Sequence, residues 1–488
     1  MLRPWSLKLE LDKDASQAIY LQIAEKIINE IRAGRLPPST VMPGTRELAR
    51  TLKVNRKTTV LAYEELISQG WLATEKRRGT FVASELPVFP EKCYLTDAPD
   101  NQGAKSDNTE PELEHLRQTP IADFTISATD NRLIPLETFS RAFRKALMLT
   151  TRTSNPTQDP QESCVLASAI ATMVNLEKNF RVDATRISVF FSNKMAIFVL
   201  ARVLINKGDV VIFERLSDPG ARETFEVCGA ELDYVDIDRH GMDVEQLAVL
   251  ARQKKIRAVY VTPQHQFPTT ATMSEVRRKE LYRLAELHNF YIIEDDREHE
   301  FYFDESLLFP IASTDTDNRT IYLGSLNNVL SPAMQVSYLV ADEELISRVK
   351  AEKQFIDFDN RYLFECALNE LMVSGELQRH RRRLGREFAE RRDRMHQVLC
   401  DELGRYVDFE IPYGGMAYWL RFHRPVNMRV LLEQARREKV KFSPAVEFHA
   451  GKEEVQAARF SFTSLNQKEL EAGLIRFKKA LLVSLQED

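Results

Sequence analysis

From residue 121 onward, short runs of β-branched and aromatic residues alternate with stretches whose apolar residues recur at helical spacing. The runs expected to be strands are Ile187–Phe191, Val210–Phe213, Ala258–Thr262, Tyr291–Glu294 and Ile321–Leu323. The stretches expected to be helices are Lys194–Lys207, Pro219–Cys228, Val244–Gln253 and Ser274–His288. Alternation at this spacing is typical of βαβ units, which build a mostly parallel sheet covered on both faces. The pattern therefore predicts an α/β domain.

The C-terminal part of the chain, from about residue 361, has a different pattern. A long, highly charged stretch at Gly375–Leu399 predicts a single long helix. The apolar runs Met416–Leu420 and Arg459–Phe462 predict strands. We therefore expect residues 361–488 to form a small α+β subdomain of a larger body that spans residues 121–488.

The first 120 residues separate from this body by composition. Residues 1–83 are rich in helical patterns, whereas residues 84–120 are rich in Pro, Asp, Asn and Gly and poor in apolar side chains. A segment of the latter kind cannot bury enough apolar surface to offset the entropy lost on ordering it. The 488-residue chain is therefore predicted to be multidomain, with a first domain at 1–83, a flexible linker at 84–120 and the body at 121–488.

The first domain shows three short helical patterns. The first spans residues 18–33 and stops at Gly34, and the second begins at Pro43. The third opens with Asn55 as its N-cap. The residues that the third helix is expected to bury are Val60, Tyr63, Leu66 and Ile67. Runs at 71–74 and 80–83 then predict a hairpin, which completes a winged helix-turn-helix of α+β type.

Polar and basic side chains gather where such a fold meets DNA. A helix-turn-helix lays its second helix in the major groove, with the first residues of that helix at base edges. These residues offer hydrogen bonds to bases and cations to phosphates, and they are Asn55, Arg56, Lys57, Thr58 and Thr59. Arg46, on the preceding helix, is expected to contact the DNA backbone. The residues of the hairpin tip, expected to enter the minor groove as a wing, are Lys76, Arg77, Arg78 and Gly79.

Charge is distributed unevenly between the predicted domains. Residues 1–83 contain 14 Lys and Arg residues against 9 Asp and Glu residues, a balance of about +5, although the whole chain has a net charge of -5. A basic first domain ahead of an acidic body suits a protein whose first domain binds a polyanion.

Several sequence features bear on the compartment. No stretch approaches the roughly 20 apolar residues that a membrane helix needs. The N-terminus lacks the apolar core of a signal peptide. The five cysteines show no CxxC spacing, so we predict neither a disulfide framework nor a metal site. Together these features predict a cytoplasmic protein with no membrane partner.

The first domain resembles the GntR family of bacterial regulators in the order and spacing of its motifs. These motifs are Tyr20-Leu-Gln-Ile, Gly34-Arg-Leu-Pro-Pro, Arg46-Glu-Leu-Ala, Val54-Asn-Arg-Lys-Thr, Ala62-Tyr-Glu-Glu-Leu and Gly79-Thr-Phe-Val. From Asp123 to about residue 482 the chain resembles fold-type-I aminotransferases, in the form fused to GntR heads in the MocR subfamily. The motifs that carry this second resemblance are Pro219-Gly-Ala-Arg, Thr262-Pro-Gln-His-Gln-Phe-Pro-Thr, Ile292-Ile-Glu-Asp-Asp and Arg379-His-Arg-Arg-Arg.

The combined resemblance implies a transcription regulator that binds double-stranded DNA. It further implies a homodimer, in which the head of one chain lies against the body of the other and two heads read two half-sites. The operator, the target genes and the sign of regulation do not follow from it.

Aminotransferases hold pyridoxal phosphate (PLP) through a Schiff-base lysine, an acid at the pyridine nitrogen and donors to the phosphate. The resemblance places Asn328 at the lysine position, in Gly324-Ser-Leu-Asn-Asn-Val, and Gln335 at the position of a phosphate-binding arginine. Two tyrosines that contact the cofactor in the family are replaced by Asp218 and Arg297. Because an asparagine amide cannot form an imine, these losses predict that PLP is absent and that the protein is not an enzyme.

Two cofactor-site matches remain. Asp295 stands at the pyridine partner, and Arg459 stands where a substrate carboxylate is clamped. Arg459, together with Lys194 at a helix start, is a candidate for binding a small carboxylate effector. Asp295 and Arg459 are equally open to interpretation as ion-paired structural residues. The alternative functions are a PLP-sensing regulator, a PLP-dependent aminotransferase that uses a different lysine, and a regulator whose body is only a dimer scaffold.

Overall fold

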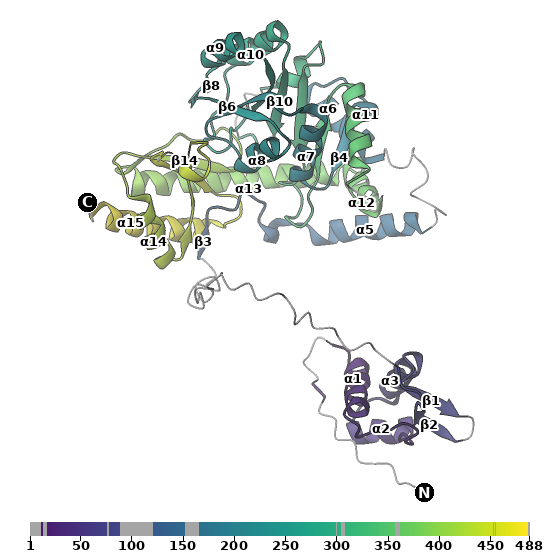
Figure 1. The fold of residues 1–488 in the computed structure, drawn as a ribbon. Coiled ribbons are helices and arrows are strands. Elements are labelled where there is room, and N and C mark those ends of the chain that lie inside the picture. Colours follow the sequence, from purple (N-terminus) through teal and green to yellow (C-terminus); the bar gives the residue numbers. More distant parts are fainter. Residues whose placement is uncertain are drawn as a thin grey trace, which may run out of the picture. The chain divides into compact units, whose positions relative to one another are not determined.

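The computed structural model describes residues 11–12, 17–75, 78–87, 121–151, 165–298, 300–303, 308–356, 362–451, 453 and 455–486. Internal contacts divide the chain into two units, residues 1–109 and 110–488 (Figure 1). Residues 88–120 of the predicted linker lie outside the described residues, so the flexibility of that segment stays a prediction. Within the described ranges, no helix combines the length and apolar character needed to cross a membrane.

The N-terminal unit contains three helices and a hairpin. The helices are α1 (Ile19–Arg32), α2 (Thr45–Leu52) and α3 (Arg56–Ser68). The strands β1 (Leu72–Glu75) and β2 (Gly79–Val82) pair antiparallel, as predicted. Asn55 caps α3 as expected, because its side-chain oxygen accepts a hydrogen bond from the backbone N–H of Lys57 at 2.9 Å.

The buried face of α3 differs from the predicted one. Ile67 is 39% exposed and Val60 is half-buried, so the expectation that both lie in the core is wrong for Ile67 and only partly met by Val60. The buried residues of α3 are Thr59, Ala62, Tyr63 and Leu66. Their spacing places them on one face of the helix, which packs against α1 and α2.

The C-terminal unit is built on a seven-stranded sheet in the order β4-β12-β11-β10-β9-β5-β6. The strands are β4 (Ile187–Phe190), β5 (Val210–Glu214), β6 (Glu231–Val235), β9 (Ile256–Val261), β10 (Tyr291–Asp296), β11 (Thr320–Ser325) and β12 (Ser337–Val340). Neighbouring strands pair parallel except for β12, which is antiparallel to both β11 and β4. The predicted mostly parallel sheet is confirmed, with β6 and β12 as strands that sequence reasoning missed.

Helices cover both faces of this sheet. One face packs against α7 (Asn193–Leu204), α8 (Pro219–Val227) and α11 (Glu343–Lys353), and the other packs against α9 (Val244–Gln253) and α10 (Glu275–His288). Successive strand residues point to opposite faces, so on β10 Ile293 enters the first core and Ile292 the second. A third core joins α6 (Val165–Lys178), α12 (Tyr362–Val373) and the C-terminal subdomain.

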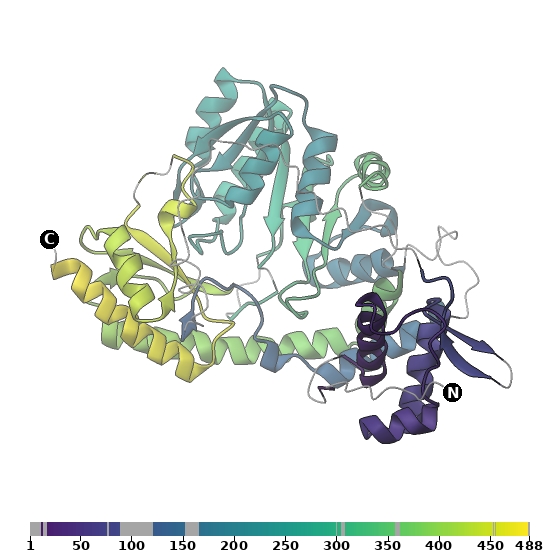
Figure 2. The ribbon, with the colours of Figure 1, turned by 60° about the horizontal axis from the view of Figure 1, so that its bottom comes forward.

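The C-terminal subdomain contains an antiparallel sheet in the order β13-β14-β17-β16. Its elements are β13 (Val407–Asp408), β14 (Ala417–Phe422), β16 (Ser443–Pro444), β17 (Ala457–Ser461), α14 (Met428–Arg437) and α15 (Gln467–Gln486). The predicted long helix is present as α13 (Glu376–Val398), which runs along the body in Figure 2. Strand β3 (Ala122–Asp123) pairs with β15 (Val440–Lys441), so the segment at residue 122 also belongs to this subdomain.

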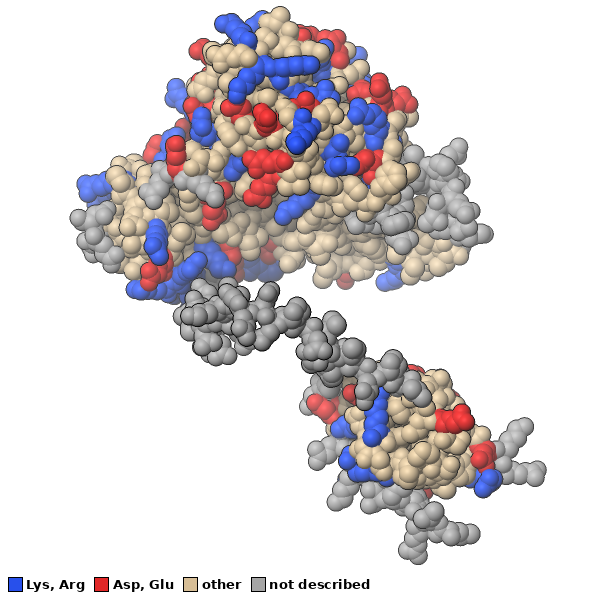
Figure 3. Space-filling model, in the orientation of Figure 1, with Lys and Arg blue, Asp and Glu red and all other residues tan. Residues whose placement is uncertain are grey.

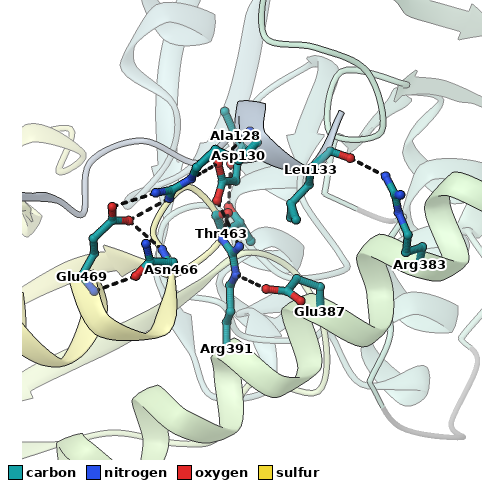
Figure 4. A network of polar contacts seen from close by, with 10 residues as sticks. Ala128, Asp130, Leu133, Arg383, Glu387, Arg391, Thr463, Asn466 and Glu469 are labelled. Atoms are coloured by element: carbon teal, nitrogen blue, oxygen red, sulfur yellow. Dashed lines mark hydrogen bonds and ion pairs between the residues drawn. The ribbon is translucent and has the colours of Figure 1, made fainter. Parts of the chain in front are cut away.

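A fully buried arginine joins α13 to two distant segments (Figure 4). The Arg391 guanidinium contacts Asp130 at 3.0 Å and Glu387 at 2.9 Å, and it donates to the carbonyl of Thr463 at 2.8 Å. The Thr463 hydroxyl in turn donates to the carbonyl of Ala128 at 2.9 Å. Burial opposes ionisation of Asp130, but hydrogen bonds from Arg132 and Arg391 outweigh it and lower the pKa of that carboxyl.

We expect the substitution Arg391→Met to lower the free energy of unfolding by about 3 kcal/mol, because it leaves Asp130 buried with only Arg132 as a charged partner. The control is Arg379→Met on the same helix, where the ion pair with Glu376 is largely exposed and the expected change is within about 1 kcal/mol. Urea denaturation followed by circular dichroism measures both. Equal losses in the two variants would contradict the assigned role of Arg391.

Candidate functional site

The start of α3 presents an exposed basic and polar surface. Asn55, Arg56 and Lys57 are exposed and Thr58 is partly exposed. Arg46, in the first turn of α2, is exposed as well. Neither Arg46, Arg56 nor Lys57 forms an ion pair with a described residue, so their charges remain available to an anion. The structure therefore brings together most of the residues predicted to meet DNA.

Thr59 does not belong to this surface, which corrects the prediction that it contacts DNA. Its side chain is fully buried, and its hydroxyl lies 2.9 Å from the backbone carbonyls of Thr45 and Arg56. The Thr45 contact joins the start of α3 to the start of α2. Thr59 therefore sets the angle between the two helices of the motif, and it cannot reach a base edge from this position.

The predicted wing is described only in part. Arg78 is exposed, pairs with Glu75 at 2.7 Å and lies over the ring of Phe81. Gly79 begins β2 with a φ of 114°, a backbone conformation that favours glycine. The other two tip residues, Lys76 and Arg77, lie outside the described residues. Since exposed ion pairs contribute little, Arg78 remains available to a phosphate.

The face of the body seen in Figure 3 carries acidic and basic side chains side by side. A surface of mixed sign attracts a polyanion weakly, since attraction to one charge is offset by repulsion from its neighbour. On that face, charge does not favour DNA binding by the body.

At the end of β10, one guanidinium joins two carboxylates. Arg297 contacts both oxygens of Asp295, at 2.8 Å through Nε and at 2.7 Å through Nη2, and its Nη1 lies 2.9 Å from Asp218. The Tyr260 hydroxyl adds a hydrogen bond to Asp295 at 2.5 Å. Burial opposes ionisation of Asp218, but the charge of Arg297 and the hydrogen bonds from Arg297 and from the backbone N–H of Gly220 together outweigh it and lower the pKa of that carboxyl. The charge of Asp295 is therefore already balanced within the chain.

Asn328 lies directly beside this cluster. Its side-chain amide donates to the backbone carbonyl of Arg297 at 2.8 Å and to Glu300 at 3.1 Å. The backbone carbonyl of Asn328 accepts a hydrogen bond from the Thr129 hydroxyl. The structure thus brings Asp295 and Asn328 together through Arg297. Gln335, the third predicted residue of this group, is exposed, and no hydrogen bond joins it to the cluster among the described residues.

Arg459 lies on β17 and is also paired within the chain. Its buried guanidinium contacts Glu298 at 2.6 Å and the Ser127 hydroxyl at 3.2 Å. It stacks over the ring of Phe267, with 4.9 Å between the guanidinium carbon and the ring centre. Lys194, the other predicted effector contact, is exposed in the first turn of α7, and no contact joins it to Arg459 among the described residues.

Sequence reasoning did not identify Glu298 or Tyr260 as members of this site. A signal for the first was present, because four consecutive charged residues, Asp295 to Glu298, follow a buried strand. Tyr260, inside β9, reads from sequence as an ordinary core aromatic.

Another buried carboxyl, Glu214, lies at the end of β5. It accepts hydrogen bonds from the Gln266 side chain at 3.0 Å and from the backbone N–H of Thr262 at 3.3 Å. Burial raises the pKa of Glu214 to about 8; these two hydrogen bonds oppose the shift and the nearby charge of Asp295 adds to it. Glu214 is therefore mostly protonated near neutral pH.

Comparison with known proteins relates both units to characterised groups. Residues 19–82 match the family model described as bacterial regulatory proteins, gntR family. The chain is 26% identical over 482 residues to the probable rhizopine catabolism regulatory protein MocR of Rhizobium meliloti, covering 97% of this chain and 96% of that protein. It is 26% identical over 476 residues to the transcriptional regulator TauR of Rhodobacter capsulatus, covering 94% and 96%.

Among solved structures, the multiple substrate aminotransferase of Thermococcus profundus superposes with a TM-score of 0.71 at 21% identity, covering 79% of this chain and 97% of that one. This likeness confirms the predicted aminotransferase fold of the body.

We expect Glu214→Gln to flatten part of the pH dependence of stability. With its pKa at about 8 when folded and about 4.3 when unfolded, Glu214 binds more protons in the folded state, so it lowers stability as pH rises between these values. Glutamine does not titrate. The variant should therefore gain thermal stability relative to the natural protein at about pH 8 and change little at about pH 5.

Calorimetric melting temperatures across this pH range provide the measurement. Glu344→Gln, at an exposed position of α11, should follow the natural protein throughout. A Glu214→Gln curve that runs parallel to the natural curve at every pH would show that Glu214 does not carry this proton.

Proposed function

We propose, on the premise that this chain is a transcription regulator of the MocR type, that it binds operator DNA through the start of α3. We also propose that its aminotransferase-like body works without PLP. The observation that carries the first part is the match of residues 19–82 to the gntR model, on a domain whose α3 begins with two exposed cations that pair with no described residue. The body then serves in dimerisation and ligand response.

The geometry of the N-terminal unit supports different roles for its exposed polar residues in DNA binding. Asn55 caps α3 through its side-chain oxygen, which leaves its amide N–H₂ free to donate to a base. Arg56 and Lys57 follow in the first turn, where a recognition helix enters the major groove. The fork of Arg56 suits bidentate contact to guanine, whereas Lys57 supplies a point charge to phosphate. Arg46 and Arg78 flank this surface as backbone contacts.

The contacts around Asp295 argue against PLP. A pyridine nitrogen needs that carboxylate, yet both of its oxygens are taken by Arg297. Asn328, which occupies the lysine position by resemblance, has no amine, and its two amide hydrogens are already donated to Arg297 and Glu300. The residues present do not fit the cofactor, and we derive no transamination step for this protein.

A homodimer is part of the proposal. The outward face of α5 (Leu136–Thr150) exposes Leu136, Leu147 and Met148, each more than half exposed, although α5 packs against α12 on its other side (Figure 1). Apolar surface of this kind favours contact with another subunit. Two heads per dimer would then read two half-sites.

The predicted carboxylate site at Arg459 needs revision in this proposal. Glu298 supplies the carboxylate that an effector would otherwise provide, at 2.6 Å. An effector bound by Arg459 must displace Glu298, which costs the charge-assisted hydrogen bond between them. Lys194 remains a separate exposed cation at a helix start.

We expect Arg56→Ala and Lys57→Ala each to weaken binding to a fragment that carries the protein's own promoter. The loss of a base contact should cost about 1–3 kcal/mol of binding free energy and reduce the ratio of the affinity for that fragment to the affinity for random DNA. The loss of a phosphate contact should instead reduce, by about one, the slope of the logarithm of the binding constant against the logarithm of the salt concentration. Fluorescence anisotropy at several salt concentrations measures both quantities. The control is Lys279→Ala, at an exposed position of α10, and this variant should bind DNA as the natural protein does.

A matched pair of threonines sharpens this test. Thr58→Val should alter DNA affinity and leave stability unchanged, whereas Thr59→Val should lower stability by about 1 kcal/mol, because it removes buried hydrogen bonds. No preference of the natural protein for promoter DNA over random DNA would overturn the proposed function.

We expect a titration with PLP to give no Schiff-base absorbance, and borohydride reduction with peptide mapping to find no labelled lysine. Asn328→Lys alone should not restore binding, since Arg297 still holds Asp295. The double variant Asn328→Lys, Arg297→Tyr frees that carboxylate, and a charge-assisted hydrogen bond of about 1.5–3 kcal/mol should tighten PLP binding at least about tenfold over Asn328→Lys. A single labelled lysine in the natural protein would instead establish PLP sensing through another lysine.

A further inference from the structure

A cavity of about 770 Å³ lies on the side of the sheet opposite Asp295. Side chains alternate along β10, so Asp296 points away from Asp295 and contacts Lys178 at 2.9 Å and the Tyr322 hydroxyl at 2.7 Å. The cavity is bounded by the end of α6, the middle of α13 and the chain at residues 300–303 and 308–310. Its volume falls within the roughly 300–1,000 Å³ typical of small-molecule sites.

One wall of the cavity is a basic stripe on α13. Arg382, Gly385, Arg386 and Ala389 line it at the spacing of one helical face. Arg381 beside them is neutralised by Glu177, with Nη2 to Oε1 at 2.8 Å. Arg382 and Arg386 are exposed, and neither forms an ion pair with a described residue. This stripe therefore presents two uncompensated cations.

The glycine in this stripe is costly for the helix. A glycine inside a helix lowers stability by about 1 kcal/mol relative to alanine. Packing of the described chain does not require it, because no described atom lies within 4 Å of the position that a Cβ at Gly385 would take. The glycine and the small Ala389 instead leave open space beside the two arginines.

The opposite wall is aromatic and apolar. Phe301, Phe303, Phe309 and Pro310 contribute to it, and Phe309 is 47% exposed although it lies beside buried neighbours. Aromatic rings of this kind offer flat surfaces for a planar molecule. A ligand that filled the cavity would cover Phe309.

A buried carboxyl group lies at the inner end of the cavity. Glu300 lines the cavity and is buried; its Oε2 accepts from Asn328, while its Oε1 has no partner among the described residues. An unsatisfied buried polar atom is destabilising, so a ligand group that meets it gains a hydrogen bond at a desolvated position. Burial raises the pKa of Glu300 to about 8, so near neutral pH it carries a proton to donate.

We propose that this cavity binds a planar aromatic carboxylate, with the carboxylate held by Arg382 and Arg386, the ring against Phe303 and Phe309, and Glu300 facing a polar atom of the ring system. The arginine fork matches a carboxylate, and two cations that form no ion pair with the described residues favour an anion. This site is separate from the Asp295 cluster and from Arg459. This proposal does not depend on DNA binding, because the experiment below measures binding of the ligand to the cavity directly.

Isothermal titration of the full-length protein with indole-3-carboxylate tests the proposal, with its methyl ester as the uncharged comparison. The acid should bind at least about tenfold more tightly than the ester. The double variant Arg382→Gln, Arg386→Gln should remove that difference. Arg379→Gln, on the same helix and paired with exposed Glu376, is the control and should bind as the natural protein does.

A second variant removes space without removing charge. Gly385→Leu should abolish binding by filling the cavity, while Gly385→Ala should raise the melting temperature and confirm that the helix tolerates a side chain there. The proposal is overturned if neither indole-3-carboxylate nor 2-naphthoate binds, or if binding survives both the double arginine variant and Gly385→Leu. It is also overturned if Gly385→Leu changes the oligomeric state and leaves binding intact, which would make the stripe a subunit contact.

Discussion

The arrangement of the body depends on the buried guanidinium of Arg391. A buried charge without partners costs several kcal/mol, so α13 cannot slide or turn unless Asp130, Glu387 and the Thr463 carbonyl move with it. The partners come from the segment ahead of α5, from α13 itself and from the segment ahead of α15, so a single side chain fixes all three (Figure 4). The same helix carries Arg382 and Arg386 closer to its N-terminus. These contacts of Arg391 therefore also hold in place the helix that forms one wall of the cavity.

The two charged positions that the resemblance carries over from aminotransferases are satisfied inside this chain. Arg297 balances Asp295, and Glu298 balances Arg459, so adjacent residues after β10 complete both. A catalytic site needs charges that are poised for the reacting molecule and gain their partner only when it binds. Charges that are already paired contribute to the stability and geometry of the fold instead. This pairing is the physical basis of the proposal that the body works without PLP.

Much of the fold could be predicted because its elements have strong local patterns. Strand β6 was missed because Glu231 and Asp233 interrupt its apolar residues. Motifs singled out Asp295 and Asn328, which the structure places on either side of Arg297, whereas the pair of Glu298 with Arg459 joins residues 161 positions apart and has no local signature. The burial of Thr59 was within reach of the sequence, since the helical spacing of Ala62, Tyr63 and Leu66 places it on the same face.

The segment that follows β10 connects the two sides of the sheet. It begins with Arg297 at the Asp295 cluster and continues to Glu300 and Phe301 at the cavity. Asn328 is hydrogen-bonded to both parts of this segment, because its side-chain amide donates to the Arg297 carbonyl and to the Glu300 carboxyl. A ligand that draws Glu300 toward the cavity therefore weakens one hydrogen bond of Asn328 and leaves the other to hold Arg297 alone. Asn328, which the resemblance places at the lysine position of aminotransferases, thus links the proposed ligand site to the Asp295 cluster through its two hydrogen bonds.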